Sequence, residues 1–249
     1  MKPILSTVLG VPLGTFIGHA WGWQTTFWIV TCLGIVAVII LVIHIPSQIK
    51  FQYQSLKSEL EAFKNPQIIL VLLITIFGYG GIFASIRILH HSLKRLPVFQ
   101  LKHITTLLFI FGIGSFLGTV TAGKLANRWL MPTLSITLVL LTAILVLFTW
   151  TVHNQILASI TVFVFGFTAF ATVPLLQTKI VQSAKEAPTL AAAVNISAFN
   201  LANAIGAYLG GETIRAGFGM DSVNLAGAAI TGIGVIFSFI LLIYVKKGF

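Results

Sequence analysis

Residues 192–211 read AAVNISAFNLANAIGAYLGG, a stretch of twenty residues without a charged side chain. A helix needs about twenty predominantly apolar residues to cross the hydrocarbon core of a bilayer, so this stretch predicts a membrane span. Small residues let helix backbones approach each other closely in lipid. We expect Asn200 and Asn203 to share one face of this helix with Gly206 and Gly210.

The whole chain has a composition that matches this stretch. Of its 249 residues, 57% are hydrophobic and 8% are charged, whereas about a quarter of a soluble domain is charged. The net charge of +10 comes from Lys and Arg scattered between apolar runs, which predicts no nucleic-acid partner. The single cysteine, Cys32, can form no internal disulfide and is expected to be a packing residue. The lipid bilayer is therefore the expected surrounding of this protein.

Eight stretches have the length and composition of membrane spans. Two of their boundaries carry no charge and depend on turn residues alone, GWQ at 22–24 and HNQ at 153–155. Strands are not expected, because the runs lack period-two alternation and lipid would leave an open sheet edge unsatisfied. The predicted fold class is an all-α membrane protein with eight transmembrane helices, at 3–20, 26–44, 67–88, 103–124, 130–151, 156–177, 189–211 and 222–245.

Lys and Arg concentrate on alternate loops, and short cytoplasmic loops retain these residues. If the N-terminus is cytoplasmic, ten of the fifteen cations lie on that side. We therefore expect both termini in the cytoplasm. The ten are Lys2, Lys50, Lys57, Lys64, Lys124, Arg128, Lys179, Lys185, Lys246 and Lys247.

One connection breaks this rule. Arg87, Lys94, Arg95 and Lys102 lie together between the third and fourth predicted spans, on the opposite side. Three explanations are open: a re-entrant or distorted helix, an anionic ligand at the outer mouth, or sequence drift in a gene no longer under selection.

The longest polar segment is 45–66. Within it Leu56, Leu60 and Phe63 recur at helical spacing opposite charged residues, which predicts a short amphipathic helix along the cytoplasmic surface. The predicted organisation is two spans, this connector and six spans, at 1–44, 45–66 and 67–249.

The first predicted span carries a glycine ridge. Gly10, Gly14 and Gly18 recur at four-residue intervals, with Pro12 between them. The glycines predict close helix packing, and the proline predicts a bend whose freed backbone groups a neighbour must satisfy.

Polar side chains inside spans are costly and face either a cavity or another helix. Asn195, Asn200 and Asn203 lie in the seventh span, and Gln177 follows Pro174 in the sixth. Two interpretations are open: these side chains line a hydrated substrate path, or they form interhelical hydrogen bonds.

Catalytic patterns are missing from the sequence. All five acidic residues fall in loops or at span ends, as do the histidines. No Gly-x-Ser-x-Gly, His-Glu-x-x-His or phosphate-loop motif is present. We expect no enzyme activity, no cofactor and no metal site.

Two segments carry a family resemblance. GVPLGTFIG at 10–18 and GWQTTFW at 22–28 resemble the fifth span and following turn of the twelve-span drug:proton antiporters of the major facilitator superfamily. The similarity is greatest to the arabinose-efflux-type members. Val11 and Thr15 depart from the glycine-rich antiporter motif of that span.

A second segment, GIGSFLGTVTAGKLANR at 112–128, resembles the eighth span and the cytoplasmic signature loop of the second half of that family. Gly123 and Arg128 match the loop, whereas Asn127 stands where the family has aspartate. That aspartate belongs to a charge network that latches helices on the cytoplasmic side.

The stretch 192–211 resembles the eleventh span of this family almost throughout. The resemblance implies a partial major facilitator fold, with two helices of the N-terminal half and a complete six-helix C-terminal half. The eight spans then correspond to the family's spans five to twelve, and the chain is truncated at its N-terminus.

The resemblance also implies a function. It indicates efflux-type transport of a small molecule by alternating access in a bacterial plasma membrane, coupled to protons in the full-length family. The alternative is a non-transporting fragment, or a piece that needs a separately encoded chain to supply four spans.

Overall fold

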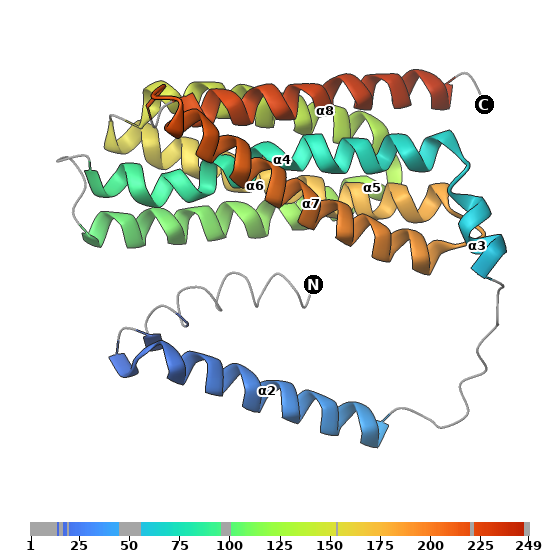
Figure 1. The fold of residues 1–249 in the computed structure, drawn as a ribbon, viewed down its shortest axis with the longest axis horizontal. Coiled ribbons are helices and arrows are strands. Elements are labelled where there is room, and N and C mark those ends of the chain that lie inside the picture. Colours follow the sequence, from blue (N-terminus) through green and yellow to red (C-terminus); the bar gives the residue numbers. More distant parts are fainter. Residues whose placement is uncertain are drawn as a thin grey trace. The chain divides into compact units, whose positions relative to one another are not determined.

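A computed structural model describes residues 14, 17–18, 20–44, 56–95, 101–152, 154–219 and 222–246. Every regular element in these ranges is a helix, as predicted. The chain divides into two compact units, Met1–Ser55 and Leu56–Phe249. Figure 1 shows α2 in the first unit and the bundle of α3 to α8 in the second.

Helix α2 (Trp23–His44) confirms the second predicted span. It begins directly after Gly22, which has a φ of +87°, a conformation that glycine adopts without steric cost. The predicted turn at 22–24 is therefore centred on this glycine. Cys32 is a free cysteine on α2, and its role as a packing residue stays a prediction.

Part of the glycine ridge lies beside α2. The hydroxyl of Thr26 donates to the carbonyl oxygen of Gly14 at 3.3 Å. A Cβ atom on Gly14 or on Gly18 would lie 3.5 Å from side-chain atoms of Thr26. Gly10 and Pro12 lie outside the described residues, as does most of the predicted span 3–20.

The second unit contains five long helices and one short helix. The five long ones and α2 are long and apolar enough to cross a membrane. Together they contain seven of the eight predicted spans, because α5 contains two. The bounds are α3 (Leu56–Ala62), α4 (Pro66–Arg95), α5 (Leu101–Thr151), α6 (Gln155–Ser183), α7 (Pro188–Arg215) and α8 (Ser222–Lys246).

Helix α5 is broken near its middle. Trp129 has non-helical backbone angles (φ −138°, ψ 43°), and Pro132 follows three residues later. A proline inside a helix lacks the N–H donor, and its ring clashes with the carbonyl of the preceding turn. Figure 1 shows the α5 ribbon turning back on itself, so its two halves correspond to the predicted spans 103–124 and 130–151.

Helices α4 and α6 extend furthest beyond their predicted ends. α4 extends to Arg95 instead of ending at residue 88, because no Gly or Pro interrupts the sequence until Pro97. The backbone of the cationic connection is therefore helical up to Arg95, whereas its side chains lie outside the described part. α6 continues beyond residue 177 to Ser183 for the same reason.

The helix ends follow local sequence signals. Asn154 caps α6, because its side-chain oxygen accepts hydrogen bonds from the backbone N–H groups of Ile156 (3.0 Å) and Leu157 (3.2 Å). Asn65 accepts from the N–H of Gln67 at 2.9 Å at the start of α4. The predicted connector helix is found as α3.

The second half of α5 supplies much of the core. Leu134, Leu138, Leu141 and Leu145 are fully buried, and their spacing of three and four residues places them along one face of the helix. They pack against buried aliphatic and aromatic residues of α4 and α6, including Ile74, Phe165 and Leu175.

Glycines bring helix backbones into contact, as the packing motifs predicted. A Cβ atom on Gly206 of α7 would collide with the carbonyl of Gly80 of α4. Cβ atoms on Gly114 and Gly118 of α5 would collide with backbone atoms of α6. Because glycine has no side chain, the two backbones can approach closely. Close packing matters in lipid, because burial of apolar side chains between helices contributes little there.

Candidate functional site

A buried polar network joins α4, α6 and α7. Asn195 is 0% exposed. Its side-chain oxygen accepts a hydrogen bond from the hydroxyl of Thr75 at 2.7 Å, and its amide group donates to the side-chain oxygen of Gln177 at 2.9 Å. The amide of Gln177 donates in turn to the carbonyl of Ala192 at 3.4 Å.

The periodicity of α7 explains why Asn195 is buried. Eleven residues separate Asn195 from Gly206, which is close to three helical turns, so both lie on the same face. Ala191, Ala198 and Ala202 complete this face, and all of them are buried. The small side chains of this face allow α7 to pack closely against its neighbours. Asn195 carries the single amide among them, and as a buried polar group it requires hydrogen-bond partners on those helices.

The placement of Asn200 differs from the expectation. It lies on the exposed side of α7, where its amide donates to the carbonyl of Ile196 at 3.1 Å, one turn earlier on the same helix. Asn203 is half-buried, and its side-chain oxygen is buried without a hydrogen-bond partner among the described residues. At about 100° per residue, position 200 turns away from the face of Gly206 and Gly210.

The structure thus brings Asn195 and Gln177 together but leaves Asn200 apart. Thr75, which completes the network, was missed because a single threonine in an apolar run gives no signal of its partner. Its hydroxyl also lies 3.0 Å from the carbonyl of Val71. Since a hydroxyl carries one hydrogen, Thr75 donates to only one of these acceptors at a time.

Pro174 frees one backbone group in α6. A proline has no N–H, so the carbonyl of Phe170 loses its usual helical donor. The hydroxyl of Thr119 on α5 lies 3.4 Å from this carbonyl and 2.8 Å from the carbonyl of Ser115 on its own helix. Thr119 can therefore partly satisfy the group that the proline frees.

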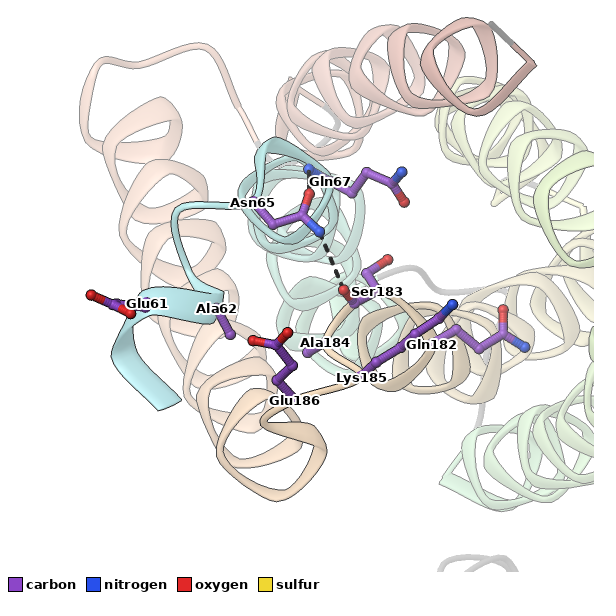
Figure 2. Close-up of a pocket in the computed structure, with 9 residues that line it drawn as sticks. All are labelled: Glu61, Ala62, Asn65, Gln67, Gln182, Ser183, Ala184, Lys185 and Glu186. Atoms are coloured by element: carbon purple, nitrogen blue, oxygen red, sulfur yellow. Dashed lines mark hydrogen bonds between the residues drawn. The ribbon is translucent and has the colours of Figure 1, made fainter. Parts of the chain in front are cut away.

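A cavity of about 520 Å³ lies where α3, the start of α4 and the end of α6 meet (Figure 2). The side-chain amide of Asn65 donates across it to the carbonyl of Ser183 at 3.4 Å. The cavity is lined by Glu61, Ala62, Asn65, Gln67, Gln182, Ser183, Ala184, Lys185 and Glu186.

Lys179 is hydrogen-bonded to a residue that lines this cavity, and its position differs from the prediction. The sequence placed it in a loop, but α6 continues past it and the side chain is only 7% exposed. Its ammonium group donates to the side-chain oxygen of Gln67 at 3.3 Å. Long cationic side chains near span ends usually reach toward water, so sequence reasoning gave no reason to expect its burial.

The predicted signature loop, 123–128, is helical and ends at the break of α5 at Trp129. Gly123, Asn127 and Arg128 are all exposed, and a Cβ atom on Gly123 would meet nothing within 4 Å. Among the residues with described side chains, neither Asn127 nor Arg128 has an ion-pair partner. The structure leaves the role of this loop as a prediction.

Comparison with known proteins places these features in a family. The chain is 34% identical over 235 residues to the inner membrane transport protein YdhP of Escherichia coli K12, covering 94% of this chain and 60% of that protein. It is 34% identical over 234 residues to the uncharacterized MFS-type transporter YfhI of Bacillus subtilis, covering 94% of this chain and 59% of that protein.

The putative transporter AraJ of E. coli K12 is more distant, with 26% identity over 229 residues, 91% of this chain and 58% of that protein. The chain therefore spans about 60% of the length of the curated relatives that it matches. Its helices and these relatives identify it as a multi-pass membrane protein. The Major Facilitator Superfamily model matches residues 4–207, and the chain belongs to this superfamily.

Proposed function

We propose that this chain forms part of a secondary transporter that exports a small molecule by alternating access, with α7 lining the substrate path. The observation that carries this proposal is the exposed polar side of α7. Asn200 and Ser197 are exposed on a helix that is apolar enough to span a membrane. Polar groups in a span face a hydrated cavity or a neighbouring helix more often than lipid.

The hydrogen bonds of α7 support a division of roles. Asn195 is hydrogen-bonded to side chains of α4 and α6, so it holds the helix in place. Asn200 is bonded only to its own helix among the described residues, and its remaining amide hydrogen and its oxygen are available to a substrate. Asn203 lies between these two positions, and its buried oxygen lacks a partner.

Proton coupling belongs to the proposal because the family resemblance implies it. The described carboxylates, Glu59, Glu61, Glu186 and Glu212, lie on or beside helix ends rather than near the middle of a span. Histidine is the residue type of this chain whose charge changes near neutral pH, so we propose a histidine for proton coupling. His90 and His91 on α4 are the first candidates for that role.

The second candidate function is that of a component that transports only together with a separately encoded chain. Transporter sites of this kind form near the bilayer midplane between structural repeats. The chain spans about 60% of the length of its curated relatives, which favours a requirement for further helices.

Export of a fluorescent dye, driven by a proton gradient in inverted membrane vesicles, distinguishes these functions. We would compare the chain with a fusion to the part of YdhP that lies outside the matched region. Activity in both forms would show that the chain suffices, and activity in the fusion alone would identify it as a component. Inactivity of both forms toward a panel of cationic, anionic and neutral dyes would argue against dye export.

Whichever form is active then tests the path on α7. We expect Asn200→Leu to lower the export rate about three- to tenfold, which is the effect of losing one hydrogen bond. Asn200→Ser, which remains polar, should retain most of the activity. Ile196→Leu is the matched control, because Ile196 is exposed one turn away and stays apolar. Equal rates in Asn200→Leu and Ile196→Leu would reject a polar path at this position.

A further inference from the structure

The cavity beneath α3 has a polar wall. Seven of its nine lining residues carry polar or charged side chains, and they come from four parts of the fold: α3, the start of α4, the end of α6 and the turn before α7 (Figure 2). Its volume of about 520 Å³ is within the range of small-molecule sites. The hydroxyl oxygen of Ser183 in this wall is buried without a hydrogen-bond partner among the described residues.

A buried cation is hydrogen-bonded to one of the lining residues. Lys179 is only 7% exposed, and its ammonium group lies one hydrogen bond from the cavity-lining side chain of Gln67. The ion pairs in the described part of the chain are Lys64 with Glu61 and Arg215 with Glu212, so no described carboxylate neutralises Lys179. Buried charges are usually paired, because an unpaired charge is costly to remove from water.

The other charges around the cavity lie closer to solvent. Lys185 and Glu186 are exposed, and the carboxylate of Glu61 is 3.8 Å from the ammonium of Lys64. Exposed charges are screened by water and salt, whereas a buried charge acts through a medium of lower dielectric constant. The charge of Lys179, linked to the cavity through Gln67, therefore favours an anion there.

We propose that this cavity binds a phosphate group, attracted by the buried charge of Lys179 and contacted by Lys185 at its edge. A phosphate offers several acceptor oxygens to ammonium, amide and hydroxyl donors at once. In our proposed orientation, the cavity lies at the cytoplasmic end of the bundle, where basic pockets between spans bind anionic lipid head groups. The phosphate can belong to a phospholipid or to a soluble compound, and the chemistry of recognition is the same.

Thermal unfolding of the purified full chain in a neutral detergent tests this site. We would titrate phosphatidylglycerol, inorganic phosphate and diacylglycerol, which has the same acyl chains but no phosphate. Phosphatidylglycerol should raise the unfolding temperature if a lipid is the source, and inorganic phosphate should raise it if the source is soluble. Stabilisation by diacylglycerol equal to that by phosphatidylglycerol, or no stabilisation by either phosphate compound, would overturn the proposal.

The variant Lys179→Met locates the effect. It removes the charge but keeps an unbranched side chain of similar length, and replacement of a buried charge by an apolar group is often neutral or stabilising. We expect the apparent affinity for the phosphate compound to fall about tenfold or more. The matched control is Lys124→Met at an exposed lysine of α5, which should leave the affinity unchanged. An unchanged affinity in Lys179→Met would overturn the proposal.

Lys185→Gln keeps the test decisive if Lys179→Met does not fold. Lys185 is exposed in the turn between α6 and α7, so its substitution does not disturb the core. The loss of its charge at the cavity edge should weaken phosphate binding about threefold. Binding that is the same in Lys185→Gln and in the unmodified chain would then count against the site.

Discussion

At the scale of single residues, two asparagines of α7 show how environment determines the role of a side chain. Asn195 is fully buried and bonded to two other helices, whereas Asn200 is exposed and bonded to its own helix. A buried polar group that loses its partner costs more than an exposed one, because water cannot replace the lost hydrogen bond. The same substitution should therefore have different consequences at these two positions.

We expect Asn195→Ala to destabilise the protein by about 1–2 kcal/mol, because it leaves the side-chain oxygen of Gln177 without its donor. Asn200→Ala should change stability by less than about 0.5 kcal/mol. Equilibrium unfolding of the detergent-solubilised variants measures both values. Similar losses of stability at the two positions would show that the buried hydrogen bonds of Asn195 contribute no more to stability than the exposed one of Asn200.

At the scale of helices, close approach of backbones fixes the arrangement of α7. Gly206 and Gly211 lie on the same helix and differ only in their surroundings. A Cβ atom on Gly206 would collide with the backbone of α4, whereas a Cβ atom on Gly211 would meet nothing within 4 Å. Alanine is favoured over glycine inside a helix unless the added methyl group has no space.

The two alanine substitutions should therefore have effects of opposite sign. Gly206→Ala is expected to destabilise by about 2 kcal/mol or more, because the colliding atom belongs to the backbone and cannot rotate away. Gly211→Ala should stabilise by about 0.5–1 kcal/mol. Equilibrium unfolding checks both. Stabilisation in the first variant would contradict the contact between α4 and α7.

The bend of α6 at Pro174 is another property of an element. The hydroxyl of Thr119 lies 3.4 Å from the freed carbonyl of Phe170 and can partly satisfy it. We expect Thr119→Val to destabilise by about 0.5–1 kcal/mol in the presence of Pro174. The destabilisation caused by Thr119→Val should be smaller in a chain that also carries Pro174→Ala, because alanine restores the backbone donor.

A double-mutant cycle measured by equilibrium unfolding isolates this coupling. Thr142→Val is the matched control, because Thr142 also lies on α5 but donates to the carbonyl of Leu138 on its own helix. Its effect should not depend on Pro174. Additive effects of Thr119→Val and Pro174→Ala would show that Thr119 does not compensate for the proline.

At the scale of the whole molecule, the distribution of cations makes a prediction about orientation. Ten of the fifteen Lys and Arg lie on the side of the N-terminus in the predicted topology, and cationic short loops remain in the cytoplasm. We expect green fluorescent protein fused after Phe249 to fluoresce and alkaline phosphatase fused there to be inactive. The reverse pattern would place the C-terminus outside the cell and overturn the assignment.

Sequence determined the helical class and the position of most spans, because span length and apolar composition follow directly from the thickness of the bilayer. It also located the turns at 22–24 and 153–155 and the small-residue face that contains Gly206, since each of these depends on a local residue preference or a short spacing.

The tertiary structure alone decided which polar groups meet. Thr75 and Asn195 are 120 residues apart, and Lys179 and Gln67 are 112 residues apart. Such pairs form where helices cross, and the crossing depends on how several helices pack at once rather than on any local pattern. For this reason the sequence identified Asn195 and Gln177 as polar residues of two spans, but only the packed bundle joined them to Thr75 and buried the charge of Lys179.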